Sequence, residues 1–228
     1  MPPTDFIPIL NPPTPTILPN NDTLLVFIYG SYQFSTMLTI HKLAGYNLST
    51  RTIVYEVLTD PDPDLENNYG TGQLPIIHQN RVYCAVGLDI ICHDLLTGKQ
   101  IWSKRYPSIF SFSGLLFLPE LNRLYANCEN QTLYCLDPLH GNHVWTEPSS
   151  GTSSQLTHHN GVIYFTGGGD GLLHAVDAQT GTHIWKAEAP FRKKDDDAFF
   201  EDGITIDPQT NRIYAYDWVR ALCFNTAR

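Results

Sequence analysis

Short runs in which apolar and polar residues alternate cover most of this chain. Leu133 and Cys135 form one such alternation and Leu173 and Ala175 another, and an apolar pair ending in Trp follows each run after a brief polar stretch. A period of two predicts β-strands, because successive side chains of a strand point to opposite faces. The pattern therefore predicts an all-β fold built from many short strands joined by tight turns.

A nine-residue unit at the end of these runs recurs along the chain. Its copies read DLLTGKQIW, DPLHGNHVW and DAQTGTHIW, and a degenerate copy, NLSTRTIVY at Asn47–Tyr55, has Asn, Arg and Tyr at the three marked places. Asp accepts hydrogen bonds from the N–H groups just ahead, and Gly adopts a positive φ, so the unit predicts a hairpin closed through a glycine bulge. The repeated residues are Asp94, Gly98, Trp102, Asp137, Gly141, Trp145, Asp177, Gly181 and Trp185.

The Trp residues decide the architecture. Burying one indole removes about 150–250 Å² from water, and a single four-stranded sheet cannot cover that area alone. Trp102, Trp145 and Trp185 lie 43 and 40 residues apart, which is the period of a propeller blade. We therefore predict a β-propeller in which each Trp packs against a neighbouring blade, in preference to a β-sandwich with similar turns.

Five blades of four antiparallel strands fit the chain as one domain over 1–228. We place them at about 22–57, 73–105, 111–147, 153–188 and 203–228. The second strands are predicted at Arg81–Val86, Arg123–Cys128, Val162–Thr166 and Arg212–Tyr216. The last blade ends before any Trp-bearing fourth strand, so we expect Asp5–Leu10 or Thr16–Leu18, within the segment 1–21, to fill that place and close the ring. A part of a larger, eight-bladed ring is the alternative.

Charge and cysteine content narrow the range of partners. The 228 residues carry a net charge of −9 with a pI near 5.3, which makes nucleic acid a poor partner. No apolar run approaches the roughly 20 residues of a membrane-spanning helix, and the start lacks a secretory signal, so the chain as written is expected in the cytoplasm unless an upstream signal is missing.

All five cysteines fall in strand-like runs and are expected to be buried free thiols, with Cys84 and Cys92 on opposite faces.

Two stretches resemble a known family of repeats. VYCAVGLDIICHDLLTGKQIW and VIYFTGGGDGLLHAVDAQTGTHIW are similar to the pyrroloquinoline-quinone-like propeller repeat, which occurs in quinoprotein alcohol dehydrogenases and in the outer-membrane β-barrel assembly lipoprotein of bacteria. The resemblance covers about 22–228. It implies a propeller, and a periplasmic or extracellular location if an upstream signal is missing, but its members range from oxidoreductases to scaffolds.

The enzymatic side of that family is not expected here. Quinoprotein dehydrogenases typically have eight blades, a catalytic Asp, a calcium site and a disulfide between adjacent cysteines, whereas this chain has no Cys-Cys pair. We therefore predict no cofactor and no metal. Among the nine histidines, His93 shares a column with apolar core residues, and His143 and His183 are expected to face solvent on outermost strands. One aligned slot before the second strand of each blade forms a candidate polar ring at the channel mouth: His78, Glu120, His159 and Gln209.

The long connections between blades point to a binding surface. In a propeller, these connections and the turns between second and third strands emerge on one face, and loops on a rigid scaffold commonly carry function. Aromatic and Arg side chains are enriched in binding patches. The candidate binding face consists of Tyr106, Asp170, Phe191, Trp218 and Arg220.

These features predict a non-catalytic binding or scaffold protein. We expect a monomer that presents its loop face to a protein or a small-molecule or glycan ligand. The alternatives are a lectin-like carbohydrate or small-ligand binder and a fragment or degenerate relative of a quinone-dependent dehydrogenase.

Overall fold

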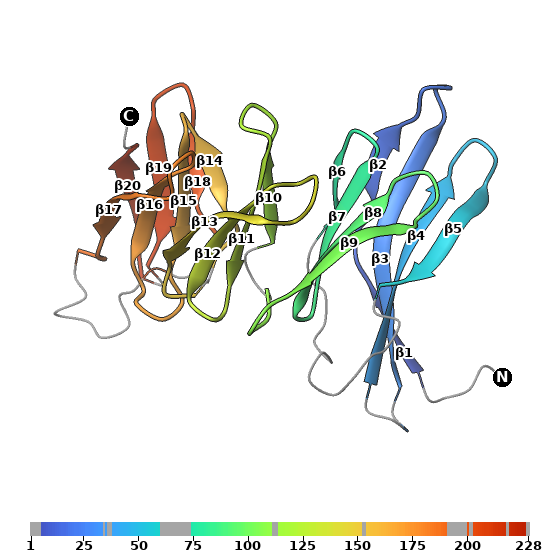
Figure 1. The fold of residues 1–228 in the computed structure, drawn as a ribbon. Coiled ribbons are helices and arrows are strands. Elements are labelled where there is room, and N and C mark those ends of the chain that lie inside the picture. The colour runs from blue at the N-terminus through green and yellow to red at the C-terminus, as the bar shows by residue number, and fades with distance from the viewer. Residues whose placement is uncertain are drawn as a thin grey trace. The chain divides into compact units, whose positions relative to one another are not determined.

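The computed structural model describes residues 6–33, 35, 38–59, 74–110, 114–151, 154–190, 200, 203–217 and 219–226. All twenty regular elements in these ranges are β-strands, and no described helix is long and apolar enough to cross a membrane. The strands form five antiparallel sheets (Figure 1). The chain divides into two compact units, Met1–Ser111 with two of the sheets and Phe112–Arg228 with three.

The first unit contains a five-stranded and a four-stranded sheet. In the first, the order is β1-β3-β4-β5 and β2 also pairs with β3; in the second it is β6-β7-β8-β9. The strands of the first sheet are β1 (Phe6–Leu10), β2 (Thr14–Ile17), β3 (Thr23–Gln33), β4 (Leu38–Asn47) and β5 (Thr52–Leu58). Those of the second are β6 (Ile76–His78), β7 (Arg81–Val86), β8 (Asp89–Asp94) and β9 (Gln100–Arg105).

The second unit contains three sheets in which sequence neighbours always pair. They consist of β10 (Leu115–Leu118), β11 (Arg123–Cys128), β12 (Thr132–Leu136) and β13 (His143–Pro148); of β14 (Thr157–His159), β15 (Val162–Thr166), β16 (Leu173–Asp177) and β17 (His183–Ala187); and of β18 (Thr205–Asp207), β19 (Arg212–Tyr216) and β20 (Ala221–Asn225). The predicted all-β, blade-forming fold is thus confirmed, and β7, β11, β15 and β19 have the predicted bounds.

The N-terminal segment lies elsewhere than predicted. β2 pairs with the first part of β3, with Thr16 opposite Leu24, and β1 pairs with the last part. The sheet of β18–β20 has three described strands, so the prediction that this segment completes the last blade and closes the ring is wrong. The physical reason is local. A short turn, in which Leu18 N–H donates to Asp22 O (2.8 Å), folds β2 back onto β3, and so short a loop has a low closure entropy cost.

The core of each unit lies between adjacent sheets. In the first unit, alternate residues of β3 and β7 are at most 1% exposed and belong to one apolar cluster. In the second unit, one cluster joins the sheets of β10–β13 and β14–β17, and another joins β14–β17 to β18–β20 around Phe200. Burial of alternate side chains from two facing sheets is what period-two patterning produces.

The cysteines are free thiols, as predicted. Cys84 and Cys92 are buried and lie opposite Ile91 and Tyr83, respectively, so they point to opposite faces of the sheet. Cys128 and Cys135 are also buried, but Cys223 is exposed. The expectation of a buried Cys223 is wrong because Cys223 lies on the open face of its sheet, opposite Tyr214, which is 41% exposed.

Candidate functional site

The predicted hairpin unit has the same geometry at each copy. At Asp177, the carboxylate Oδ1 accepts hydrogen bonds from the N–H groups of Gln179 (3.0 Å) and Thr180 (2.9 Å), and Gly181 N–H donates to Asp177 O. Gly98, Gly141 and Gly181 have φ of +69°, +70° and +80°, and a bulge interrupts the ladder before each turn. The degenerate copy forms the same turn with Asn47 as the acceptor and Arg51 at φ +56°.

The glycine of this turn also receives an aromatic ring from the preceding sheet. A Cβ added to Gly98 would lie 2.4 Å from the Tyr55 ring, and a Cβ added to Gly181 would lie 2.7 Å from the Trp145 ring. Only glycine permits so close an approach. We call these contacts the Tyr55 seat and the Trp145 seat. In the Trp145 seat the indole Nε1–H donates to Gln179 O (3.1 Å).

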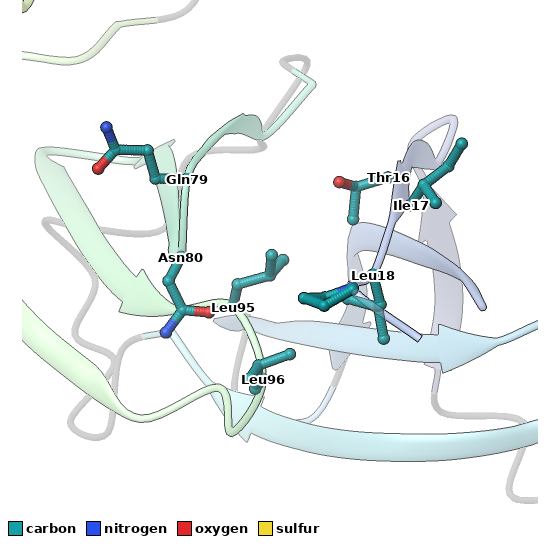
Figure 2. A pocket seen from close by; sticks show the side chains of 8 residues that line it. Thr16, Ile17, Leu18, Gln79, Asn80, Leu95 and Leu96 are labelled. Carbon is teal, nitrogen blue, oxygen red and sulfur yellow. The ribbon is translucent and has the colours of Figure 1, made fainter. Parts of the chain in front are cut away.

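A cleft of about 350 Å³ lies near the Tyr55 seat within the first unit (Figure 2). One wall consists of the end of β2 and the two residues after it, with Thr16 facing the opening and Leu18 packed on the core. The other wall consists of the β6–β7 turn and the β8–β9 turn, with Leu95 directed across the opening. We call this site the amide cleft; its lining residues are Thr16, Ile17, Leu18, Pro19, Gln79, Asn80, Leu95 and Leu96.

Hydrogen bonds hold both walls of the amide cleft in place. Thr14 Oγ1 donates to Pro75 O (3.0 Å) and ties β2 to the chain before β6. Leu95 N–H donates to Asn80 O (3.0 Å) and the Asn80 side chain donates to Asp94 (2.7 Å), so the two turns of the other wall are fixed to each other.

The chemistry of the amide cleft is apolar and uncharged. None of its eight lining residues is ionisable, and its polar groups are the Gln79 and Asn80 carboxamides and the Thr16 hydroxyl. Ile17 is 74% exposed and Leu96 is 45% exposed. An apolar group held by a few hydrogen bonds is the ligand chemistry that such a lining accepts.

The described residues of the candidate binding face differ in their surroundings. Tyr106 is 5% exposed and packs edge-on against Phe110 at 5.0 Å, so its ring is not presented to a partner. Asp170 bonds to His174, and Arg220 pairs with Asp217 (3.4 Å). Phe191 and Trp218 lie outside the described residues.

Two residues of the candidate polar ring make contacts between neighbouring turns of the second unit. Glu120 meets His158 (3.6 Å) rather than His159, and His159 Nε2 bonds to Asn211 Oδ1 (2.8 Å). The backbone N–H of Gln209 donates to Asp207 Oδ1 (2.9 Å) within its own turn, and His78 is half-buried at the end of β6. In the described part of the chain, no three His, Cys, Asp or Glu side chains are placed to hold a metal ion.

Two histidines, His93 and His183, are mostly buried and bonded to neighbouring groups. His93 is a core residue, as predicted, with Nδ1 2.8 Å from Gly98 O, and burial lowers its pKa. His183 does not face solvent as predicted. Its side chain is 18% exposed and lies between Glu147 of the preceding sheet and the buried His174. No pattern within one blade indicates this contact, because Glu147 and His183 belong to adjacent blades. Glu147 follows one Trp by two residues, and His183 precedes the next by two.

Comparison with known proteins supports the fold. The sequence model of a family described as outer membrane protein assembly factor BamB matches residues 40–185 and 129–218, which together are more than half of the chain. No curated protein sequence is similar enough to count as a match.

Three solved structures illustrate the likeness of fold. BamB from Moraxella catarrhalis has a TM-score of 0.61 and 13% identity over 95% of this chain and 57% of that chain, so this chain spans little more than half of its length. Quinohemoprotein alcohol dehydrogenase from Comamonas testosteroni has a TM-score of 0.53 and 18% identity, over 67% of this chain and 30% of that chain. A chain of the mitotic checkpoint complex has a TM-score of 0.61 and 10% identity, over 95% of this chain and 72% of that chain. At these identities the likeness shows the fold alone.

Proposed function

The chain belongs to the family of the outer membrane protein assembly factor BamB, and on this premise we propose that it is a non-catalytic propeller scaffold that binds a partner protein through the amide cleft. The observation that carries the proposal is the uncharged, aliphatic lining of that cleft. Structures of similar fold come from an assembly factor and from a multiprotein complex, which is consistent with a protein partner.

The exposed rim of the amide cleft supports a protein ligand. Ile17 and Leu96 expose 74% and 45% of their surface beside a cavity of about 350 Å³. Aliphatic side chains grouped at a rigid cleft are typical of sites that accept an apolar anchor from a partner. The Gln79 carboxamide and the Thr16 hydroxyl are suited to the backbone of an extended segment, while the Asn80 carboxamide already donates to Asp94.

A carbohydrate is less well matched to the same lining. Sugars present many hydroxyl groups and apolar ring faces, which call for a dense set of polar partners and an aromatic platform. The residues around the amide cleft include no aromatic ring and only two carboxamides and one hydroxyl. We therefore favour a short extended peptide with an aliphatic side chain as the ligand.

A matched pair of leucines provides the test. Leu96 and Leu139 occupy the same place in two copies of the turn, two residues after Asp, and are 45% and 51% exposed, but only Leu96 lines the cleft. Peptides selected from a displayed random library against the full chain should bind wild type and Leu139→Ser equally. Leu96→Ser should weaken them about three- to tenfold, because covering the exposed half of a Leu side chain contributes about 0.7–1.5 kcal/mol.

The control decides the interpretation. Circular dichroism and thermal unfolding of both variants establish that the fold is retained. If the selected peptides bind Leu96→Ser as tightly as Leu139→Ser, or if no peptide is selected, the amide cleft is not the binding site.

A further inference from the structure

Four ionisable side chains form an unbranched chain of contacts in the second unit. Asp170 Oδ1 lies 3.1 Å from His174 Nε2, His174 Nδ1 lies 3.1 Å from His183 Nε2, and His183 Nδ1 lies 2.7 Å from Glu147 Oε1. All three distances are within hydrogen-bond range. We call this set the proton chain; its members are Asp170, His174, His183 and Glu147.

The proton chain connects two sheets. Glu147 belongs to β13, whereas His174 and His183 belong to β16 and β17 of the next sheet, and Asp170 lies in the turn before β16. The His174 ring is fully buried and stacks on Phe165 at a centroid distance of 4.7 Å, which fixes the direction in which its two nitrogens point.

Counting protons shows that two neutral histidines cannot complete this chain. Ionised carboxylates only accept, and a neutral imidazole has one N–H and one lone pair. Three contacts therefore need three protons, while two neutral rings supply two. If both rings donate outward to the carboxylates, two nitrogen lone pairs face each other at 3.1 Å. If one ring turns its proton inward, a carboxylate oxygen faces a lone pair.

We infer that the proton chain is a binding site for one additional proton, which completes its three hydrogen bonds and joins the sheet of β10–β13 to the sheet of β14–β17. In the completed form one imidazole is an imidazolium that donates from both nitrogens. The other ring is neutral, and the two carboxylates with one imidazolium carry a net charge of −1.

Geometry places the additional proton on His183, whose two ring nitrogens lie 2.7 Å from Glu147 Oε1 and 3.1 Å from His174 Nδ1. The His174 side chain is fully buried, whereas that of His183 is 18% exposed, so His174 is the neutral ring and donates from Nε2 to Asp170. Burial also lowers the pKa of His174, against the raising effect of Asp170. Burial raises the pKa of Asp170, but hydrogen bonds from His174 and Ser150 outweigh it and keep the pKa below its usual value. His183 then donates to Glu147 and to His174 Nδ1.

Among the described residues, Lys186 also carries a charge that acts on the proton chain, because it lies opposite His174 in the β16–β17 ladder. Its positive charge disfavours protonation of His174 and leaves His183, bonded to Glu147, as the site of the imidazolium. The third proton stabilises the folded form at low pH and is lost as pH rises. The contribution of neutral His174 to stability has the opposite pH dependence. It grows as pH rises, because the unfolded chain binds a proton at this residue more readily than the folded chain does.

The direct test is the protonation state of the imidazoles in the wild-type full chain. Nitrogen-15 spectra of protein labelled at histidine, assigned with single His→Gln variants, distinguish protonated from unprotonated ring nitrogens. At about pH 7, where a free imidazole is mostly neutral, His183 should be protonated at both nitrogens and His174 at Nε2 only. An unprotonated nitrogen on His183 at that pH would overturn the inference.

A carboxylate pair gives a second, independent test. Glu147→Gln removes one end of the proton chain without changing its shape, whereas Glu188→Gln removes an exposed carboxylate just after β17. The imidazolium signal of His183 should be lost at about pH 7 in Glu147→Gln and kept in Glu188→Gln. The stability advantage of wild type over Glu147→Gln should shrink as pH rises from about 6 to about 8. Retention of the signal in Glu147→Gln, or an advantage that does not change with pH, would contradict the proposal.

Discussion

The Tyr55 seat and the Trp145 seat use the same backbone arrangement with different side chains. Both rings end a copy of the repeat and lie against the glycine of the next turn. Trp145 donates its indole N–H to Gln179 O, whereas the Tyr55 hydroxyl is buried and has no hydrogen-bond partner among the described residues. Burial accordingly raises the pKa of Tyr55. The comparison indicates that the repeat uses Trp because the seat provides an acceptor for an indole N–H.

The Tyr55 seat, which lacks the hydrogen bond of the Trp145 seat, lies near the amide cleft. The degenerate copy that supplies Tyr55 also has Arg51 at a positive φ where the other copies have glycine. Backbone strain and unsatisfied polar groups are tolerated more often at functional sites than elsewhere. In this chain such strain is not confined to the first unit, because Gln131 and Asn160 of the second unit also have positive φ.

The largest expected effect concerns the glycine beneath Trp145. Gly181→Ala adds a Cβ within 2.7 Å of the indole at a residue with φ +80°, so backbone strain of about 1–2 kcal/mol and overpacking of about 1–3 kcal/mol combine. Gly161→Ala is the matched control, because its φ is +76° but no atom lies within 4 Å of the added Cβ. In urea unfolding, the free energy of unfolding should fall by about 2–5 kcal/mol in Gly181→Ala and by about 1–2 kcal/mol in Gly161→Ala. Equal losses would mean that the close contact contributes nothing.

Removing the polar atom of each ring should have effects of opposite sign. Trp145→Phe loses the hydrogen bond to Gln179 and part of the buried area, which we expect to destabilise by about 1–3 kcal/mol. Tyr55→Phe removes a buried hydroxyl without a partner among the described residues, so it should stabilise by about 1 kcal/mol. Thermal and urea unfolding of the two variants measure both changes. A destabilised Tyr55→Phe would show that the hydroxyl has a partner after all.

The sequence predicted the regular blades well because their signals are local. Alternation followed by an Asp-to-Gly turn determined the second strands to the residue, and the fixed spacing of Trp indicated the blade period. The pairing of the N-terminal strands with β3 was not predicted, because no residue pattern within a strand indicates which other strand it pairs with. Pro12, Pro13 and Pro15 also obscure the pattern of β2, although proline is tolerated on an edge strand.

The candidate site was harder to predict because it depends on contacts between sheets. Tyr106 was assigned to an exposed loop, yet Phe110 covers its ring. His183 was assigned to solvent, yet Glu147 of the preceding sheet reaches it. Gln79 and Leu96 occur in ordinary turns, and only the packing of β2 beside them makes a cleft. A search for polar residues near successive Trp residues would have found the Glu147–His183 pair, but no local pattern indicates the amide cleft.

The smallest expected effect compares Asp94 with Asn47, which accept equivalent hydrogen bonds in the turns of the first unit. Asp94→Asn keeps an acceptor for the turn but turns an N–H toward the Asn80 carboxamide, so it should lower stability at pH 7 by about 0.5–1 kcal/mol. Burial raises the pKa of Asp94, but hydrogen bonds from Thr97 and Leu96 outweigh it and leave the pKa below its ordinary value. A carboxyl of this kind stabilises the fold above its unfolded pKa of about 3.9, and the contribution is lost as pH falls through the folded value. Urea unfolding from about pH 6 to about pH 3 should then show wild type losing more stability than Asp94→Asn. A difference between the two proteins that stays constant with pH would mean that the turn binds an amide and a carboxylate equally well, and that the Asp of the repeat has no electrostatic role.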